Sequence, residues 1–318
     1  MRILVLMGGR STEREISLQT GRAIAKGLRS LNHDVIEYDL DPSHGKGIEE
    51  LLRSGLLLDV DIVFIALHGG EGEDGRIQAT LEILGVAYTG SGVEASALCM
   101  DKIATKIFLE HYNLPTPEWF SIDDSKPVES IVYQVESIGG FPVVVKPADQ
   151  GSTVGVSIVK SSEEIEPAIE EAARYSERIL VERYIEGREL SIPVFGNEVF
   201  PIVEIRPRTG FYDYKRKYTK GETEYVCPAV LDDKVREQVE QSALKAFQVL
   251  GCSGVARVDL RLGKDGIGYL LEVNTIPGMT ETSLVPMAAE AIGISFPDLL
   301  ERIVVDGIER NKRRKCGG

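Results

Sequence analysis

The chain has 318 residues, of which 43% are hydrophobic, so it is long enough for two or three domains with a large buried core. Thirty-six basic residues against fifty acidic ones give a formal charge of −14, which argues against general binding to nucleic acid or to an anionic membrane. The total charge does not exclude a nucleotide, because a few lysines that converge in a cleft matter more for such a ligand.

Residues 1 to about 100 alternate short apolar runs with helical patterns. Strands are expected at ILVL, DVIEY and DIVFIAL, with a helix from about Thr12 to Leu31 and a weaker helix near 48–53. This alternation predicts parallel β–α–β units in a doubly wound sheet. Because ligands of such sheets bind at the carboxyl ends of the strands, the loops that begin at Gly8 and His68 are candidate site loops.

Both loops are rich in glycine and carboxylates. The first, GGRSTERE, enters a helix whose free backbone N–H groups could hold an anion, although it is not a GxGxxG motif. Glu13 in this loop is either a site residue or a carboxylate that favours the helix N-terminus. The second, HGGEGEDG, directly follows a buried strand, and its glycines would let the backbone approach a ligand closely, but a solvated turn explains it as well.

Residues 101–185 predict a small α+β unit. A helix is expected over 101–112, a strand that ends on Lys146, a Gly-rich turn with a second strand, a helix over 162–174 and a strand at RILVERYI. An unpaired ammonium at the end of the β-branched run before Lys146 would be costly to bury. Residues 151–155, GSTVG, offer hydroxyls and backbone N–H donors, so lysine and loop together could clamp a phosphate without forming a Walker A motif.

Residues 186–318 predict a third region. Strands are expected at RELSIPVF and EVFPIVEIRP, a long helix over 232–250, and further helices from about Ser283 and Phe296. The segment from about 207 to 225 is dense in tyrosine and lysine and has no clear period. A long irregular segment inside a compact domain is more often an active-site lid than filler, so we expect a lid here.

A hairpin over 254–274 carries an unusual polar face. In the register that pairs Asp259 with Glu272, Arg257 faces Asn274, and all four side chains share one face with valines and leucines on the other. Two carboxylates about 5 Å apart repel by roughly 3 kcal/mol at an effective dielectric near 20, which suggests a cation between them. These oxygen ligands suit Mg²⁺. The alternative is a solvent-facing edge hairpin, but the apolar strand before Asn274 favours a site.

The cysteines and the chain ends indicate a cytoplasmic protein. MRILVLMGG is too short for a secretory signal or a membrane span and predicts a buried first strand. The four cysteines lie far apart without a CxxC pair, which is typical of a reducing compartment and gives no sign of structural zinc. The basic run 310–315 fits either an interaction tail or a helix end that favours the macrodipole.

The order of these features resembles the ATP-grasp enzymes and, more narrowly, the D-alanine:D-alanine ligase family. The resemblance runs from about residue 7 to 290, and its last two segments are the most specific. The matching segments are GGRSTEREISLQTG, LHGGEGEDGRIQATLE, MDKIATK, VVVKPADQGSTVGVS, VERYIEGRELSIPVF, FYDYKRKYTKGETEYVCPA and GVARVDLRLGKDGIGYLLEVNTIPGMTETSLVPMAA. It implies a three-domain ATP-grasp fold of α/β and α+β class: an N-terminal doubly wound substrate domain (1–100), a central lid domain (101–185), and a C-terminal domain (186–318) with the metal site and an omega-type lid loop (207–225).

The resemblance also implies roles for individual residues. Two Mg²⁺ ions, or Mn²⁺, would be held by Asp259, Glu272 and Asn274. The residues implied to bind ATP are Lys102, Lys146, Ser152, Glu182, Ile185, Glu189 and Lys217. Those implied to bind D-alanine are Glu13, His68, Lys217, Ser283 and Leu284. Those implied in catalysis are Glu13, Ser152, Tyr218, Arg257 and Gly278, with the last two stabilising the oxyanion of the tetrahedral intermediate.

The activity that the resemblance implies is ATP-dependent ligation of two D-alanine molecules for peptidoglycan synthesis, with a homodimer and possible activation by a monovalent cation. Tyr218 resembles the dipeptide-forming members, which favours D-alanine over D-lactate as second substrate. Two alternatives stay open. One is another ATP-grasp ligase, such as a D-alanine:D-lactate ligase, and the other is a non-catalytic nucleotide-binding regulator, which would be expected to have lost a metal ligand or Arg257.

Overall fold

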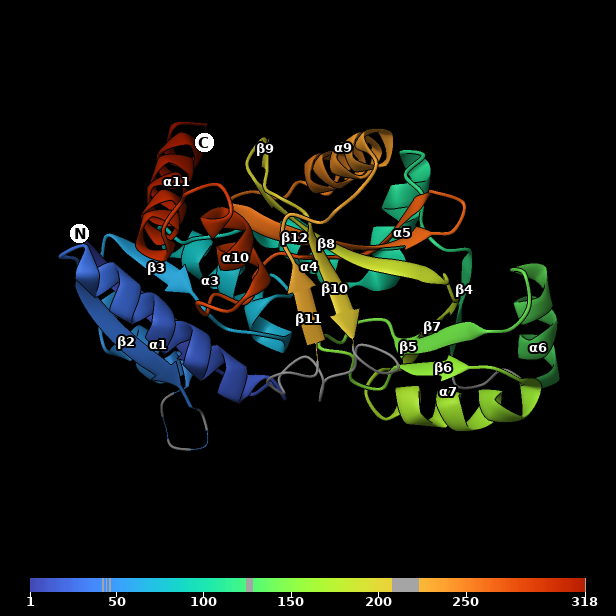
Figure 1. The fold of residues 1–318 in the computed structure, drawn as a ribbon. Coiled ribbons are helices and arrows are strands. Elements are labelled where there is room, and N and C mark those ends of the chain that lie inside the picture. The colour runs from blue at the N-terminus through green and yellow to red at the C-terminus, as the bar shows by residue number, and fades with distance from the viewer. Residues whose placement is uncertain (42, 44, 46, 124–127, 208–222, 318) are drawn as a thin grey trace.

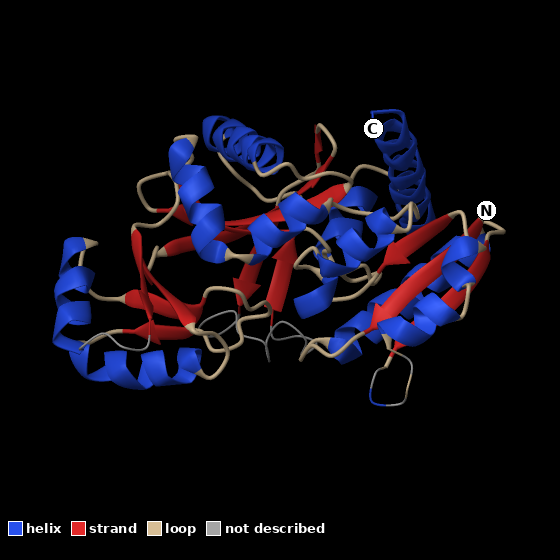
Figure 2. Ribbon diagram, turned by 180° about the vertical axis from the view of Figure 1, so that it is seen from behind, coloured by secondary structure: helices blue, strands red, loops and turns tan. Residues whose placement is uncertain are grey.

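The computed structural model describes residues 1–41, 43, 45, 47–123, 128–207 and 223–317. Within these residues the chain forms three β-sheets in sequence order. The first and second sheets lie at opposite ends of the molecule, and the third lies between them (Figures 1 and 2). No helix of the described residues is long and apolar enough to cross a membrane.

The first sheet is parallel and covered on both faces, as the sequence predicts. Its strands are β1 (Arg2–Gly8), β2 (Asp34–Leu40) and β3 (Ile62–Ile65), in the order β2-β1-β3. Alternate residues of β1 enter two different hydrophobic clusters, because successive side chains of a strand point to opposite faces. The helices that share these clusters are α1 (Arg14–Ser30) and α11 (Phe296–Gly317) on one face, and α2 (Ile48–Arg53) and α3 (Arg76–Ile83) on the other.

The second sheet is antiparallel and carries helices on one face. Its order is β4-β7-β5-β6, with β4 (Trp119–Asp123), β5 (Val143–Pro147), β6 (Ser157–Val159) and β7 (Arg178–Arg183). Residues of α6 (Val128–Ser137) and α7 (Ile165–Ala173) pack with Val143, Val145 and Val181 in one cluster. The alternation of the strands therefore turns Lys146 and Glu182 to the opposite face.

The third sheet is the largest. Its order is β11-β10-β8-β12-β13, with β9 paired to β8. The strands are β8 (Gly187–Phe195), β9 (Glu198–Val199), β10 (Val203–Pro207), β11 (Thr223–Val226), β12 (Val255–Gly263) and β13 (Gly268–Asn274). Residues of α9 (Asp233–Val249) pack on β8, β12 and β13, and α5 (Lys102–His111) contributes Leu109 to the same cluster. The remaining helices among the described residues are α4 (Val93–Met100), α10 (Leu284–Glu290), η2 (Leu56–Leu58), η3 (Gly70–Gly72) and η4 (Ser162–Glu164).

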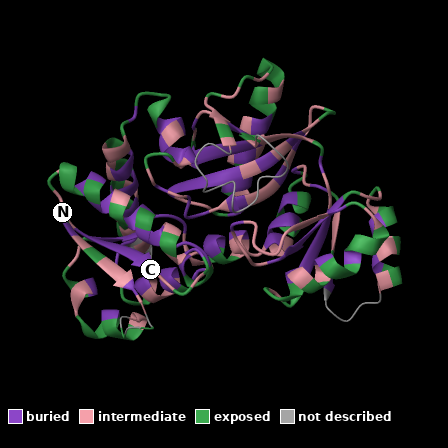
Figure 3. Ribbon diagram, turned by 60° about the horizontal axis from the view of Figure 1, so that its bottom comes forward, coloured by how far each residue is buried: buried purple, intermediate pink, exposed green. Residues whose placement is uncertain are grey.

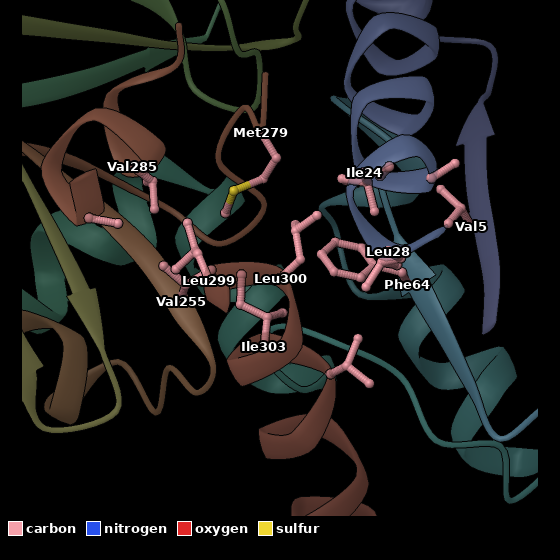
Figure 4. Packing of buried hydrophobic residues seen from close by; sticks show 14 of the residues in the cluster. Val5, Ile24, Leu28, Phe64, Val255, Met279, Val285, Leu299, Leu300 and Ile303 are labelled. Carbon is pink, nitrogen blue, oxygen red and sulfur yellow. The ribbon is translucent and has the colours of Figure 1, made fainter. Parts of the chain in front are cut away.

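One hydrophobic cluster joins the first and third sheets. Figure 4 shows Ile24 and Leu28 of α1 near Phe64 of β3, with Leu300 of α11 reaching toward them. Residues of β10, β12, α10 and α11 belong to the same cluster. The cluster of the second sheet, in contrast, contains only residues of the second sheet and its helices among those described. Buried segments run through all three sheets, and exposed residues lie on the outer helices (Figure 3).

The structure corrects one expected boundary and adds elements that the sequence patterns missed. The ends of the irregular segment expected over 207–225 belong to strands, because Pro207 of β10 pairs with Thr223 of β11. Residues 208–222 lie outside the described part of the chain. The strand β4 and the helices α3, α4 and α6 were not predicted. Each sheet falls inside one of the predicted ranges 1–100, 101–185 and 186–318, whose boundaries stay a prediction.

Gly187 gives a test of the pairing between β8 and β12. A Cβ atom on this residue would lie 1.9 Å from the carbonyl oxygen of Leu262, so the two strands would have to separate. We expect Gly187→Ala to lower the free energy of unfolding by about 2 kcal/mol. Gly92→Ala is the control, because its Cβ would meet no atom nearer than 3.8 Å. Urea denaturation would measure both, and an equal loss in the two variants would contradict the expectation.

Candidate active site

A cavity between the second and third sheets gathers most of the expected site residues. Its walls come from β5 and β7 on one side and from β8, β12 and β13 on the other. The expected residues that line it are Lys102, Lys146, Ser152, Glu182, Ile185, Glu189, Arg257, Asp259, Glu272 and Leu284. Two further hollows adjoin it. One shares Gln150 and contains Glu13 and His68, and the other shares Glu272 and contains Asn274.

A buried carboxylate lies between two buried lysines on the wall formed by the second sheet. Glu182 is 2% exposed, its Oε1 accepts a hydrogen bond of 2.5 Å from Lys146 Nζ, and its Oε2 lies 2.8 Å from Lys106 Nζ. Burial alone would raise the pKa of Glu182, but the two ammonium groups outweigh it and lower that pKa. The Oε2 atom has a charge partner but no hydrogen bond of ordinary geometry among the described residues. It therefore keeps the capacity to accept a hydrogen bond from a ligand.

The opposite wall is the hairpin of β12 and β13. Its observed register pairs Asp259 with Glu272 and Arg257 with Asn274, which confirms the register predicted from the sequence. Asp259 accepts hydrogen bonds from Arg257, from Asn274 and, at 2.7 Å, from Ser191 of β8. All three donors fix the carboxylate on the face that lines the cavity.

Cationic side chains lie beside both hairpin carboxylates, and the metal cation expected between the carboxylates stays a prediction. Arg257 Nη2 lies 2.7 Å from Asp259, and Lys102 Nζ lies 3.3 Å from Glu272. These side chains neutralise the carboxylates within the protein, so electrostatic repulsion alone does not indicate a metal. The case for Mg²⁺ depends instead on the chemistry of the oxygen donors.

A bulge changes the cavity face of β13. The register shifts between Asp259 and Leu260, so the strict alternation expected for the hairpin fails and Leu271 lines the cavity beside Glu272. The sequence pattern placed valines and leucines on the other face. Leu271 adds an apolar surface to the site that simple period-two counting cannot reveal.

Glu13 connects the first sheet to the Gly/Ser loop of the second. It precedes α1, but its side chain makes no capping hydrogen bond to that helix and instead accepts one from Ser152 Oγ. Ser152 and Thr153 both have left-handed backbone conformations, with φ of 49° and 63°. These observations favour the site interpretation of Glu13 over a purely local role at the helix end. Tyr218 and Lys217, to which the resemblance gives roles at this site, lie outside the described residues.

His68 lies deep at the end of the first sheet. Its Nε2 is 3.0 Å from Thr20 Oγ1 and its Nδ1 is 3.5 Å from Glu73 Oε1. The ring is 5% exposed and lines the same hollow as Glu13. The two glycine-rich loops therefore meet at one end of the sheet. The strands β2 and β3 lie on opposite sides of β1 there, and ligands of such sheets bind at a point of this kind.

The residues expected for the second substrate lie beyond the hairpin. Ser283 precedes α10, and its Oγ accepts a hydrogen bond of 3.0 Å from the backbone N–H of Thr280. A Cβ on Gly278 would lie 3.1 Å from the same Oγ atom, so the loop approaches closely here. Leu284 follows and lines the main cavity. On the nucleotide side, Glu189 is held 3.2 Å from Arg261 Nη1.

Sequence reasoning missed three residues that shape this site. Ser191 lies opposite Asp259 in the β8–β12 pair, and Lys106 lies four residues after Lys102 on the same helix. The second spacing is a usable signal, because residues four apart share a helix face. The third is Leu271, which the bulge turns toward the cavity.

Comparisons with known proteins agree with the resemblance found in the sequence. Family models described as "D-ala D-ala ligase C-terminus" and "D-ala D-ala ligase N-terminus" match residues 108–305 and 42–91. The D-alanine–D-alanine ligase of Syntrophotalea carbinolica is 44% identical over 304 residues, with 95% of each chain covered, and that of Desulforudis audaxviator is 46% identical over 309 residues, with 95% and 97% covered.

A solved structure extends the similarity to the whole fold. The crystal structure of D-alanine–D-alanine ligase from Bacillus anthracis complexed with ATP superposes with a TM-score of 0.86, is 33% identical and covers 99% of both chains. The expected resemblance and the expected ATP-grasp fold class are confirmed.

The charge of Glu182 gives a test of the buried ion pairs that it forms with Lys106 and Lys146. We expect Glu182→Gln to lower the free energy of unfolding at pH 7 by about 3–5 kcal/mol, because it leaves two buried ammonium groups without their carboxylate. Since the folded-state pKa of Glu182 is lowered, its contribution is present above the ordinary carboxyl pKa and is lost as pH falls through the folded-state value. Urea denaturation at several pH values would measure it.

The matched control is Glu118→Gln. Glu118 pairs with Arg183 at the surface, with 58% of its side chain exposed, so its loss should cost less than about 1 kcal/mol. An equal loss of unfolding free energy in the two variants would contradict the role assigned to the ion pairs of Glu182. So would a difference between the variants that does not shrink at acid pH.

Proposed function

This chain belongs to the D-alanine–D-alanine ligase family, and we propose that it joins two D-alanine molecules into D-alanyl-D-alanine for peptidoglycan synthesis, with ATP converted to ADP and phosphate. The observation that carries the proposal is the cavity where the lysines and Glu182 of one wall face the carboxylates and Arg257 of the other. Such a site can bind a polyanion at one end and activate a carboxylate beside it.

ATP binds against the second sheet. The buried Oε2 of Glu182 can accept a hydrogen bond from the adenine amino group, and Val144, Ile185 and Leu271 provide apolar surface for the ring. Lys146 and Lys102 lie where they contact the phosphates, and Glu189 binds the ribose hydroxyls. The ATP complex of the Bacillus anthracis relative supports ATP as the nucleotide.

Magnesium is held by the hairpin. Asp259, Glu272 and Asn274 offer two carboxylates and one amide oxygen from facing strand positions, a hard donor set that fits Mg²⁺ and also Mn²⁺. Two bound ions supply charge neutralisation for the transferring phosphoryl group. The hydrogen bonds from Ser191 and Arg257 orient Asp259 for this task, and Lys102 does the same for Glu272.

The reaction has two balanced steps. A carboxylate oxygen of the first D-alanine attacks the γ-phosphorus of ATP, the bond to the bridging oxygen breaks, and ADP leaves. The amine of the second D-alanine then attacks the carbonyl carbon of the acyl phosphate, loses a proton, and phosphate departs with the electron pair of the C–O bond. Glu13 holds the ammonium of the first substrate near His68. Arg257 and the backbone N–H of Gly278 stabilise the oxyanion of the tetrahedral intermediate.

The second substrate and the exclusion of water complete the proposal. Ser283 and Leu284 receive the carboxylate of the second D-alanine. An acyl phosphate exposed to water would hydrolyse, so the site has to be closed during the reaction. Ser152, Lys217 and Tyr218 are assigned to this closure, with the segment over 207–225 as the lid. The protein acts in the cytoplasm as a homodimer. A monovalent cation activates it.

The direct test is to incubate the protein with ATP, Mg²⁺ and D-alanine and to measure phosphate and D-alanyl-D-alanine. We expect stoichiometric formation of both, with much slower turnover of L-alanine. D-lactate added as second substrate tests the ester-forming alternative. No dipeptide, equal turnover of L-alanine, or preferential ester formation would contradict the proposal, and nucleotide binding without any turnover would favour a regulator.

Glu272→Gln tests the metal assignment. We expect turnover to fall by at least about 10³-fold, because one carboxylate that holds the ions at the transferring phosphoryl group is lost, while the circular dichroism spectrum is unchanged. Asp265→Asn, in the turn at the other end of the same hairpin, is the control and should retain full activity. Activity retained by Glu272→Gln would show that the hairpin does not hold the metal.

A further inference from the structure

Lys106 is a charged side chain to which the proposed reaction gives no role. It belongs to α5, and its side chain is completely buried. Its Nζ lies 2.8 Å from Glu182 Oε2 and donates hydrogen bonds of 2.6 Å to Thr116 Oγ1 and 3.2 Å to the carbonyl oxygen of Pro117. Two of the three N–H donors of the ammonium group are thus used in hydrogen bonds, and the contact with Glu182 is an ion pair.

The contacts of Lys106 connect three parts of the chain. Thr116 Oγ1 in turn donates to the carbonyl oxygen of Leu270, at 2.9 Å, and the N–H of Leu270 donates to the carbonyl oxygen of Pro115, at 2.8 Å. The segment between α5 and β4 is thereby fixed to β13, next to Leu271 and the proposed metal ligand Glu272. Lys106 therefore holds Glu182 of the second sheet in a fixed position relative to the hairpin of the third.

Packing alone does not account for a lysine here. An apolar side chain of similar length would fill the same space without the cost of burying a charge, and such replacements are often neutral or stabilising. Burial lowers the pKa of Lys106 to about 8, against the raising effect of Glu182. A charge retained in spite of this cost points to a need for the charge at Glu182.

We propose that Lys106 is a positioning residue for recognition of the nucleotide base and acts through Glu182. The inference rests on the proposed function, in which Glu182 accepts a hydrogen bond from the base. With Lys146 on Oε1 and Lys106 beside Oε2, the carboxylate stays ionised and cannot rotate, so Glu182, which lines the cavity, offers only hydrogen-bond acceptors. Such a group favours a purine with an amino group at that edge and rejects one with a carbonyl oxygen.

Removal of Lys106 should therefore change which base is bound. In Lys106→Met, Glu182 is held by Lys146 alone, so it can rotate or take up a proton and then donate a hydrogen bond to a carbonyl. We expect the KM for ATP to rise about tenfold while kcat changes less than about threefold, and the preference for ATP over inosine 5′-triphosphate to fall about tenfold. Calorimetric titration of both nucleotides with Mg²⁺ would measure the same change without turnover.

The matched control is Lys245→Met. Lys245 also donates to the end of α5, through the carbonyl oxygen of Tyr112 at 2.9 Å, but it is exposed and does not contact Glu182. Both KM and base preference should match the wild type. A Lys106→Met variant that loses thermal stability but keeps the KM and the preference of the wild type would overturn the proposal, because a purely structural role predicts that outcome.

A double-mutant cycle separates action through Glu182 from a general effect. Glu182→Gln should weaken ATP about as much as Lys106→Met, and the double variant should bind like either single one. If the double variant instead loses as much ATP affinity as the product of the two single losses, the proposal is overturned. If Lys106→Met does not fold, the double variant, which leaves no unpaired buried carboxylate, is compared with Glu182→Gln alone, and a further loss of affinity overturns it. Absence of dipeptide from the wild type would instead contradict the proposed function, while the titrations would still test Lys106.

Discussion

Buried and half-buried charges face each other across the cavity between the second and third sheets, and their mutual neutralisation is the constraint on which the site depends. Among the described residues that line it, five are cations (Lys102, Lys146, Arg183, Arg257, Arg261) and four are carboxylates (Glu182, Glu189, Asp259, Glu272). The lining thus carries one net positive charge in a chain whose formal charge is −14. A low local dielectric strengthens each of these contacts and makes any unpaired member costly. The total charge of the chain therefore says little about the charge that a ligand meets.

Local periodicity explains which parts of this site could be predicted. The hairpin register followed from alternation and a short turn, because both strands are adjacent in sequence. The partners of its carboxylates could not follow in the same way. Lys102 comes from α5, far from Glu272 in sequence, and its approach depends on the packing of α5 against the third sheet. The sequence therefore suggested a metal cation between the carboxylates, whereas Lys102 and Arg257 supply part of the neutralising charge.

The same distinction applies to the fold. The parallel sheet was readable because β1 and β3 are buried on both faces and α1 carries an apolar stripe. The strand β4 was missed because it follows two prolines and pairs with β7, more than fifty residues away. The strand β11 was read as irregular because its residues Thr223–Val226 are mostly polar and become a strand only through pairing with β10. Non-local pairing decided both, and single-sequence patterns do not contain it.

The distribution of the hydrophobic clusters bears on how the site can work. The first and third sheets share one cluster, whereas the second has a cluster of its own among the described residues. The seam between the second sheet and its neighbours is made of polar contacts. These contacts are Ser152 to Glu13, Lys102 to the carbonyl oxygen of Gln150, and Lys106 through Thr116 to β13. Groups joined by hydrogen bonds can bind water when the contact opens, while apolar surface cannot. A seam of this kind suits a cavity that has to admit a nucleotide and amino acids and then exclude water while an acyl phosphate exists.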